Sequence, residues 1–202
     1  PHSMVKRLTL PEPCHSLQTA AYLSRTHTQV QGAEVVLTLC APPRVVIAGL
    51  SSVALYCANF AQALGFETLV CEHREDVLLN LADELAASVT LIKQFPASYL
   101  EREGCHSGTA ILSLTHDPRI DDLTMMEAVN LPAFYIGAMG SQNNSLRRKE
   151  RLVRIGELHP EQINRIHAPI GMDIGSKTPA EIALSIMADS VRQKNGLMGE
   201  LT

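Results

Sequence analysis

The sequence predicts an α/β fold in which helices cover a doubly wound, mostly parallel β-sheet, with a short N-terminal appendage ahead of it. Short apolar runs alternate along the chain with segments of helical periodicity, the order expected of parallel strands joined by right-handed crossovers. The runs at 44–48 and 109–114 are almost continuously apolar, as in strands that are buried on both faces. With 46 % hydrophobic and 19 % charged residues, the composition permits the large core that such a sheet needs.

A Pro-Pro pair at positions 42–43 marks the expected boundary between two parts of the chain, because such pairs interrupt regular elements. Residues 4–41 are expected to form the N-terminal appendage, and residues 42–202 the Rossmann-like main domain. Residues 1–3 precede Met4 and are interpreted as an expression scar. Periodicity predicts strands at 30–39, 44–48, 67–71, 88–92, 109–114 and 133–137. It predicts helices at 17–25, from Gly49 to about 64, at 77–87, 97–103, 123–130 and 145–154, from 160, and at 179–194.

Composition and charge exclude several classes of function. The net charge is −4 and only 4 % of the residues are aromatic, so the chain lacks the basic stripe and the stacking rings of a non-specific nucleic-acid binder. No apolar run approaches the roughly 20 residues that span a bilayer, and the start of the chain lacks the apolar stretch of a signal peptide. The five cysteines include no C-x-x-C pair, which favours reduced thiols over disulfides or zinc. We therefore expect a cytoplasmic protein without a membrane anchor or bound metal.

The loop after the strand at 44–48 has the form Gly-x-Ser-x-x-Ala. In a dinucleotide-binding loop the first glycine makes a tight turn, the second lets the backbone approach the diphosphate, and a small third residue lets the helix pack on the strand. Gly49 and Ala54 fit the first and third roles, whereas Ser51 brings a side chain to the second. Ser51 or Ser52 could cap the helix or donate to a single phosphate. The loop indicates a Rossmann-type core, while nucleotide binding and a purely structural turn both stay open.

Polar residues also follow the strands predicted at 67–71 and 109–114. Glu72 lies about 23 residues after the first glycine, where an acidic residue accepts hydrogen bonds from a ribose diol, and Arg74 could instead meet a phosphate. The alternative is an exposed charged loop. Thr115, His116 and Asp117 follow the strand at 109–114. Adjacent His and Asp side chains diverge on an extended backbone, so we expect one ligand contact and one turn-forming aspartate, not a catalytic dyad.

A glycine-rich turn and a basic helix follow the strand at 133–137. The turn contains Gly137, Gly140 and Ser141, and such a backbone can fold around an anion. The downstream helix carries cations along one face, at Arg147, Arg151 and Arg154. Two interpretations of that face stay open: a solvated surface, or a surface that docks an acidic partner.

The last candidate loop lies in front of the C-terminal helix. Thr178, Pro179 and Glu181 occupy the N-cap, N1 and N3 positions of a capping box, which a purely structural role explains. Capping does not explain the preceding Gly-Met-Asp-Ile-Gly segment, for which we favour a ligand role. Its candidate residues are Gly171, Asp173 and Gly175.

Several of these segments together resemble a known family. The stretches at 133–141, 167–175 and 178–183 are similar to the C-terminal Rossmann domain of the XdhC/CoxI family, which comprises xanthine dehydrogenase accessory proteins. The segments at 44–49 and 114–118 match in the same order, and the resemblance covers residues 42–195. Because the motifs are long and ordered, the resemblance is far more specific than a single glycine pattern.

The resemblance implies an accessory protein of the kind that matures molybdenum hydroxylases, without catalytic residues of its own. Such a protein would bind the molybdenum cofactor, as molybdopterin or its dinucleotide, protect it during sulfuration and deliver it to a xanthine dehydrogenase-like enzyme. A cysteine desulfurase is implied as a further partner, and a homodimer stays open. A phosphorylated pterin cofactor would suit a cleft with several anion-binding loops.

Three departures from the family's pattern bear on the site. Residues 49–52 read Gly-Leu-Ser-Ser where the family has Gly-Ala-Gly-His, which affects nucleotide binding at the first helix. Residues 140–143 read Gly-Ser-Gln-Asn where the family has Gly-Ser-Arg-Arg, which removes two cations. The family also carries an upstream domain with a cofactor-holding cysteine, whereas about forty residues precede the core here.

Two further functions stay open from the sequence. An NAD(P)-dependent oxidoreductase would have the same fold, but the missing second glycine and the lack of a Tyr-x-x-x-Lys pair count against it. A degenerate Rossmann module that acts only in protein interaction is favoured by the changes at Ser51 and Gln142. The intact loop from Gly171 to Gly175 counts against that last interpretation.

Overall fold

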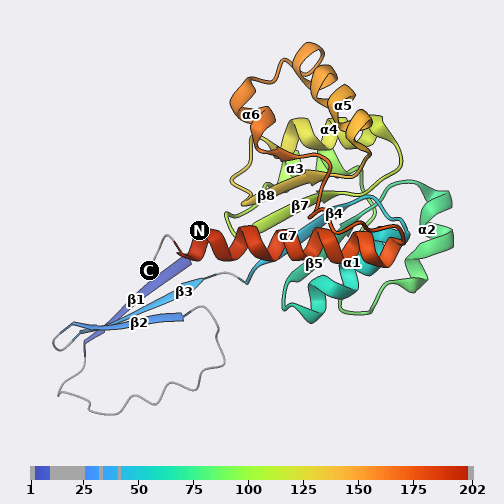
Figure 1. The fold of residues 1–202 in the computed structure, drawn as a ribbon. Coiled ribbons are helices and arrows are strands. Elements are labelled where there is room, and N and C mark those ends of the chain that lie inside the picture. Colours follow the sequence, from blue (N-terminus) through green and yellow to red (C-terminus); the bar gives the residue numbers. More distant parts are fainter. Residues whose placement is uncertain (1–2, 10–25, 32–33, 41, 200–202) are drawn as a thin grey trace. The chain divides into compact units, whose positions relative to one another are not determined.

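The computed structural model describes residues 3–9, 26–31, 34–40 and 42–199. The chain divides into two compact units, Pro1–Pro42 and Pro43–Thr202, and the division falls at the Pro-Pro pair. The first unit contains three antiparallel strands, β1 (Ser3–Thr9), β2 (Thr26–Gln31) and β3 (Glu34–Cys40), in the order β1-β3-β2 (Figure 1).

The strand expected at 30–39 is therefore two strands. β2 and β3 pair with each other from Thr26 opposite Leu39 to Gln31 opposite Glu34. The single strand was a wrong prediction because a glycine inside a strand-like run is a signal for a turn between paired strands, and Gly32 falls between these two in the sequence. The helix predicted at 17–25 lies outside the described residues.

The main unit contains a six-stranded parallel sheet, which confirms the predicted fold class. Its strand order is β6-β5-β4-β7-β8-β9, so the chain winds outward from β4 in one direction and then from β7 in the other. This is the strand order of dinucleotide-binding Rossmann folds, in which ligands bind at the carboxyl ends of the strands near the reversal point. The strands are β4 (Arg44–Ala48), β5 (Glu67–Cys71), β6 (Thr90–Ile92), β7 (Thr109–Ser113), β8 (Tyr135–Ala138) and β9 (Ile166–His167).

Helices cover both faces of this sheet, and alternate residues of the central strands point into the two resulting cores (Figure 1). Val45 and Ile47 of β4 pack into the core on the side of α1 (Ser52–Ala63) and α7 (Pro179–Gly199). Val46 packs into the opposite core. The residues of that core come from α3 (Pro96–Glu103), α4 (Pro118–Ala128), α5 (Gln142–Arg154) and α6 (Pro160–Asn164). Burial on both faces explains why these strands read as continuous apolar runs.

The ends of several helices differ from the predicted ones for local reasons. α4 begins at Pro118 because the Asp117 side chain caps it, and α5 begins at Gln142 because Ser141 caps it. The helix expected at 77–87 is α2 (Glu75–Leu81) followed by a short 3₁₀ turn, Ala82–Glu84. β9 has only two residues, too few for a periodicity signal. Within the described parts of the chain, no helix is long and apolar enough to cross a membrane.

Candidate functional site

A cavity of about 640 Å³ opens at the carboxyl edge of the sheet, over the ends of β7, β8 and β9. The loops that follow these three strands supply most of its wall, and the N-terminal halves of α4, α5 and α7 supply the rest. Among the lining residues are Thr115, His116, Asp121, Gly140, Gln142, Asn144, Arg148, Gly171, Asp173, Ser176 and Ser185. The cavity therefore joins loops that are far apart in the sequence, at the edge where Rossmann folds bind ligands.

The glycine turn after β4 is adjacent to this cavity but is closed by its own neighbours. Gly49 has a φ of +90°, and a Cβ added there would lie 2.1 Å from Cγ2 of Thr115. The Leu50 N–H donates to the Glu72 carboxylate at 2.8 Å. The buried Ser51 hydroxyl donates to the Leu114 carbonyl at 2.9 Å and accepts from the Ala54 N–H at 3.2 Å. Two groups that could face a diphosphate, the Leu50 N–H and the Ser51 hydroxyl, are thus engaged within the protein.

Glu72 is the residue that holds this turn closed. Its side chain is only 1 % exposed and accepts hydrogen bonds from the backbone N–H groups of Leu50, His73 and Arg74. The Arg74 guanidinium adds two more, at 3.0 and 2.7 Å. Burial by itself would raise the pKa of Glu72, but the hydrogen bonds from Arg74 and Leu50 outweigh it and lower that pKa to about 2. A ribose diol could bind Glu72 only by displacing these donors.

The loop after β7 sends its polar side chains in different directions. The Thr115 hydroxyl is buried and donates to Asp121 at 2.7 Å, while His116 is exposed and lines the cavity. Asp117 caps α4 by accepting from the Arg119 N–H at 2.9 Å, and its other oxygen pairs with the Arg119 guanidinium. The adjacent His and Asp side chains form no dyad.

A buried ion pair forms the floor of the cavity, and the sequence analysis missed it. Arg148, 3 % exposed, donates to Asp121 at 2.8 Å, to Asp122 at 3.1 Å and to the Met139 carbonyl at 3.1 Å. Asp121 also accepts from the hydroxyls of Ser113 and Thr115, both at 2.7 Å. Burial raises the pKa of Asp121, and the hydrogen bonds from these hydroxyls and the positive charge of Arg148 oppose the rise.

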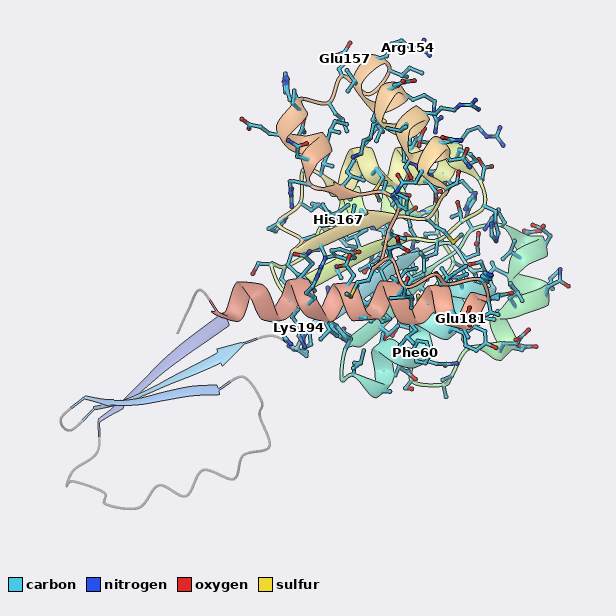
Figure 2. The ribbon with its side chains drawn as sticks, in the orientation of Figure 1. Phe60, Arg154, Glu157, His167, Glu181 and Lys194 are labelled. Atoms are coloured by element: carbon cyan, nitrogen blue, oxygen red, sulfur yellow. The ribbon has the colours of Figure 1, made fainter. Side chains whose placement is uncertain are left out.

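This ion pair changes the interpretation of the basic helix α5. Arg148 faces inward, and Arg151 is half-buried against Asp122 at 2.7 Å. Arg147 and Arg154 are exposed, and Figure 2 shows Arg154 at the outer end of α5. The one signal that could have identified Arg148 is its spacing from Leu152 and Ser145, which places the three residues on one helix face. Only the outer cations of α5 remain available to a partner.

The loop before α7 is held against the rest of the domain by a buried relay. Gly171 has a φ of +94°, and a Cβ there would lie 2.6 Å from the Ser185 hydroxyl of α7. The Tyr135 hydroxyl of β8 accepts from the Gly171 N–H at 3.3 Å and donates to the buried Asp189 at 2.7 Å. This arrangement positions Asp173, which is exposed and lines the cavity. The capping box at Thr178 and Glu181 is present, with hydrogen bonds of 2.9 and 3.3 Å.

We expect Tyr135→Phe to lower the free energy of unfolding by about 1–3 kcal/mol, because it leaves a buried carboxylate oxygen and the Gly171 N–H without their hydroxyl partner. Urea unfolding measures the change, and hydrogen exchange of the 171–175 amides should show faster opening of the loop. Tyr56→Phe is the matched control, since Tyr56 is 45 % exposed on α1. Equal stability of the two variants would contradict the relay.

The structure brings some of the predicted site residues together and separates others. Five of them line the cavity: Thr115, His116, Gly140, Gly171 and Asp173. The rest do not: Gly49, Ser51, Ser52, Ala54, Glu72, Arg74, Asp117, Gly137, Ser141 and Gly175. Gly137 allows close packing, because a Cβ there would lie 2.5 Å from Ile170. No group of three or more His, Cys, Asp or Glu side chains able to hold a metal occurs among the residues that the structure describes. The ligand roles of all these residues stay predictions.

Fold and cavity together define a Rossmann-type domain with a cavity of small-molecule size at the carboxyl edge of its sheet. The family described as the XdhC Rossmann domain matches residues 45–190. The chain belongs to this family, which confirms the resemblance drawn from its loop motifs.

Three curated bacterial proteins are similar to this chain. The uncharacterized protein YqeB of Escherichia coli (strain K12) is 31 % identical over 166 residues, which are 79 % of this chain and 29 % of YqeB. A probable xanthine dehydrogenase subunit of Bacillus subtilis (strain 168) is 28 % identical over 156 residues, or 75 % of this chain and 43 % of that protein. The molybdenum cofactor insertion chaperone PaoD of Escherichia coli (strain K12) is 27 % identical over 166 residues, or 82 % and 44 %. The chain thus spans less than half the length of each of them.

A solved structure shares the fold. The crystal structure of a xanthine dehydrogenase from Bacillus halodurans aligns with a TM-score of 0.66 and 21 % identity, covering 91 % of this chain and 52 % of that one.

Proposed function

We propose that this domain belongs to a maturation factor for a xanthine dehydrogenase-type molybdenum hydroxylase, and that it holds a molybdopterin-type cofactor in the cavity over β7, β8 and β9. The observation that carries the proposal is the cavity itself. Its volume of about 640 Å³ lies within the range of small-molecule sites, which is about 300–1,000 Å³. The relatives named for molybdenum cofactor insertion and for xanthine dehydrogenase support the maturation role.

The lining chemistry suits a polar heterocycle better than a metal ion. The side chains of Gln142 and Asn144 present amide donors and acceptors, and Asp173 presents an exposed carboxylate. A pterin ring carries donors and acceptors along its edge, which such groups can pair with. Arg148 would orient the backbone at Met139 more than bind the cofactor, because two carboxylates already share its charge. The cofactor would supply the metal and its dithiolene sulfurs, while the chain would bind, orient and shield it.

The closed turn at Gly49 favours this function over that of an NAD(P)-dependent oxidoreductase. A bound dinucleotide would need the Leu50 N–H and the space beside Ser51, both of which are used within the protein. The exposed part of α5 is proposed to contact an acidic surface of the client enzyme through Arg147 and Arg154. Participation of a cysteine desulfurase, cytoplasmic localisation and a homodimer belong to the same proposal.

Purification from a host that makes the cofactor tests the proposal. The full chain is expected to retain molybdenum, measured by mass spectrometry, together with a pterin whose oxidised form fluoresces. Asp173→Ala should lower the retained pterin several-fold and leave the melting temperature close to that of the wild type. Gly140→Val should lower the retained pterin as well, with a lower melting temperature because Gly140 has a φ of +158°. Asp83→Ala, an exposed change in the 3₁₀ turn after α2, is the control. Equal pterin retention in all three variants would refute the placement of the cofactor in this cavity. A thermal shift specific to NAD, together with turnover of NAD, would refute the proposed maturation function.

A further inference from the structure

We infer that the cavity contains one oxyanion subsite, at the N-terminus of α5, which takes a single phosphate monoester and not a diphosphate. The inference deepens the proposed function and rests on it, because it concerns the phosphate of the same cofactor. Four features carry it: the space beside Gly140, the first turn of α5, the hydroxyl of Ser145 and the closed turn after β4.

A buried hydroxyl without a hydrogen-bond partner lies beside the cavity wall. Ser145 is 2 % exposed, and its Oγ has no partner within the described part of the chain. Buried polar groups are nearly always paired, so such an exception asks for a ligand or a water. The hydroxyl faces the wall at Gly140, since a Cβ placed on Gly140 would lie 3.8 Å from Ser145 Oγ and 3.6 Å from Arg148 Nη1.

The first turn of α5 directs donors toward the same space. The Asn144 N–H is capped by the Ser141 hydroxyl at 3.2 Å, and the Ser145 N–H bonds to the Ser141 carbonyl at 2.9 Å. The N–H groups of Gln142 and Asn143 have no carbonyl one turn back in the helix to donate to, as in the first turn of every helix, and they carry the positive end of the helix dipole. Gln142 and Asn144 also line the cavity. An oxyanion beside Gly140 would thus meet a hydroxyl, a helix N-terminus and a guanidinium.

The charges around this space limit what it can bind. Arg148 is shared with Asp121 and Asp122, and Asp173 stands on the opposite loop. One dianionic phosphate meets enough donors here, but a second phosphate group would approach these carboxylates. The turn at Gly49 offers a second phosphate no Leu50 N–H, because that N–H already donates to the Glu72 carboxylate. The site therefore fits one phosphate group attached to a larger polar molecule.

Thermal unfolding of the full chain in inorganic phosphate, at constant ionic strength set with chloride, tests the subsite. We expect saturable stabilisation of the wild type by phosphate. Ser145→Ala should weaken the apparent affinity about 10-fold through loss of one hydrogen bond to a charged group. Without phosphate, Ser145→Ala should raise the melting temperature by a few degrees, because it removes an unpaired buried hydroxyl and alanine is the best helix former.

Ser190→Ala is the matched control, since Ser190 is a buried helical serine whose hydroxyl donates to the Ile186 carbonyl at 2.9 Å. It should lower the melting temperature and leave the phosphate response unchanged. An identical phosphate response in the wild type and in Ser145→Ala overturns the subsite, as does the absence of any response in the wild type. Retention of pterin together with either result would leave the proposed function standing. A phosphate response that depends on Ser145, without pterin retention, would support the subsite and refute the cofactor.

Discussion

Replacing Arg148 with methionine is expected to lower the free energy of unfolding by about 3–5 kcal/mol, which is the usual cost of removing one partner of a buried ion pair. Asp121, which is 2 % exposed, would lose its charged partner and keep the hydroxyls of Ser113 and Thr115 as side-chain donors. Methionine fills a similar volume, so the loss should come mainly from the unpaired charge and not from a void. Urea denaturation monitored by circular dichroism measures the change.

A double variant separates the charge effect from packing. Adding Asp121→Asn to Arg148→Met removes the unpaired carboxylate. The double variant should therefore be more stable than Arg148→Met alone, and a double-mutant cycle measures this coupling free energy. Arg147→Met is the control, because Arg147 is exposed on the same helix, and we expect a change within about 0.5 kcal/mol. If the Arg148 and Arg147 variants were equally stable, the ion pair would not hold the cavity floor.

Replacing Glu72 with glutamine is expected to lower the free energy of unfolding by about 2–3 kcal/mol at neutral pH, the range for losing charge-assisted hydrogen bonds at a buried acceptor. The amide would place an NH₂ group against donors that now meet a carboxylate oxygen. Arg74 is partly exposed and can turn to solvent, which keeps the loss below that of the Arg148 variant. Glu75→Gln, an exposed change in the first turn of α2, is the matched control.

The pH dependence of this difference has a defined direction. Glu72 has a lower pKa in the folded state, about 2, than its ordinary value of 4.5. Its ionised form therefore stabilises the fold above pH 4.5, and this stabilisation is lost as the pH falls toward 2. The stability gap between the wild type and Glu72→Gln should be constant from pH 7 to 5 and shrink between pH 4.5 and about 2. A gap that grew on acidification would contradict the hydrogen bonds seen at Glu72.

The parallel sheet could be predicted because its strands carry their own signal. Val45 to Ala48 and Ala110 to Leu112 are buried on both faces, and double burial demands an unbroken apolar run. The loop motifs could be matched because they combine backbone requirements, such as the positive φ of Gly171, with fixed spacing along the chain. Helix starts at Asp117 and Ser141 were less visible, because a capping side chain precedes the periodic part of its helix.

The side-chain contacts in and beside the cavity could not be predicted from the sequence, because they join segments that are far apart in the chain. Glu72 looks like a ribose ligand by position, yet it bonds to the turn 22 residues earlier at Leu50. Arg148 looks like one cation among several, and only the placement of α4 against α5 brings Asp121 to it. Such long-range partners are set by tertiary packing, which local patterns do not encode.

The close approach of Gly49 and Thr115 has a consequence for how such sequences are searched. Any larger residue at position 49 would collide with Thr115, whether or not the turn holds a phosphate. Selection for folding alone can therefore preserve the opening glycine long after nucleotide recognition has been lost. In surveys of divergent relatives, the residues at positions 51 and 72 should discriminate binding from non-binding turns better than the glycine does.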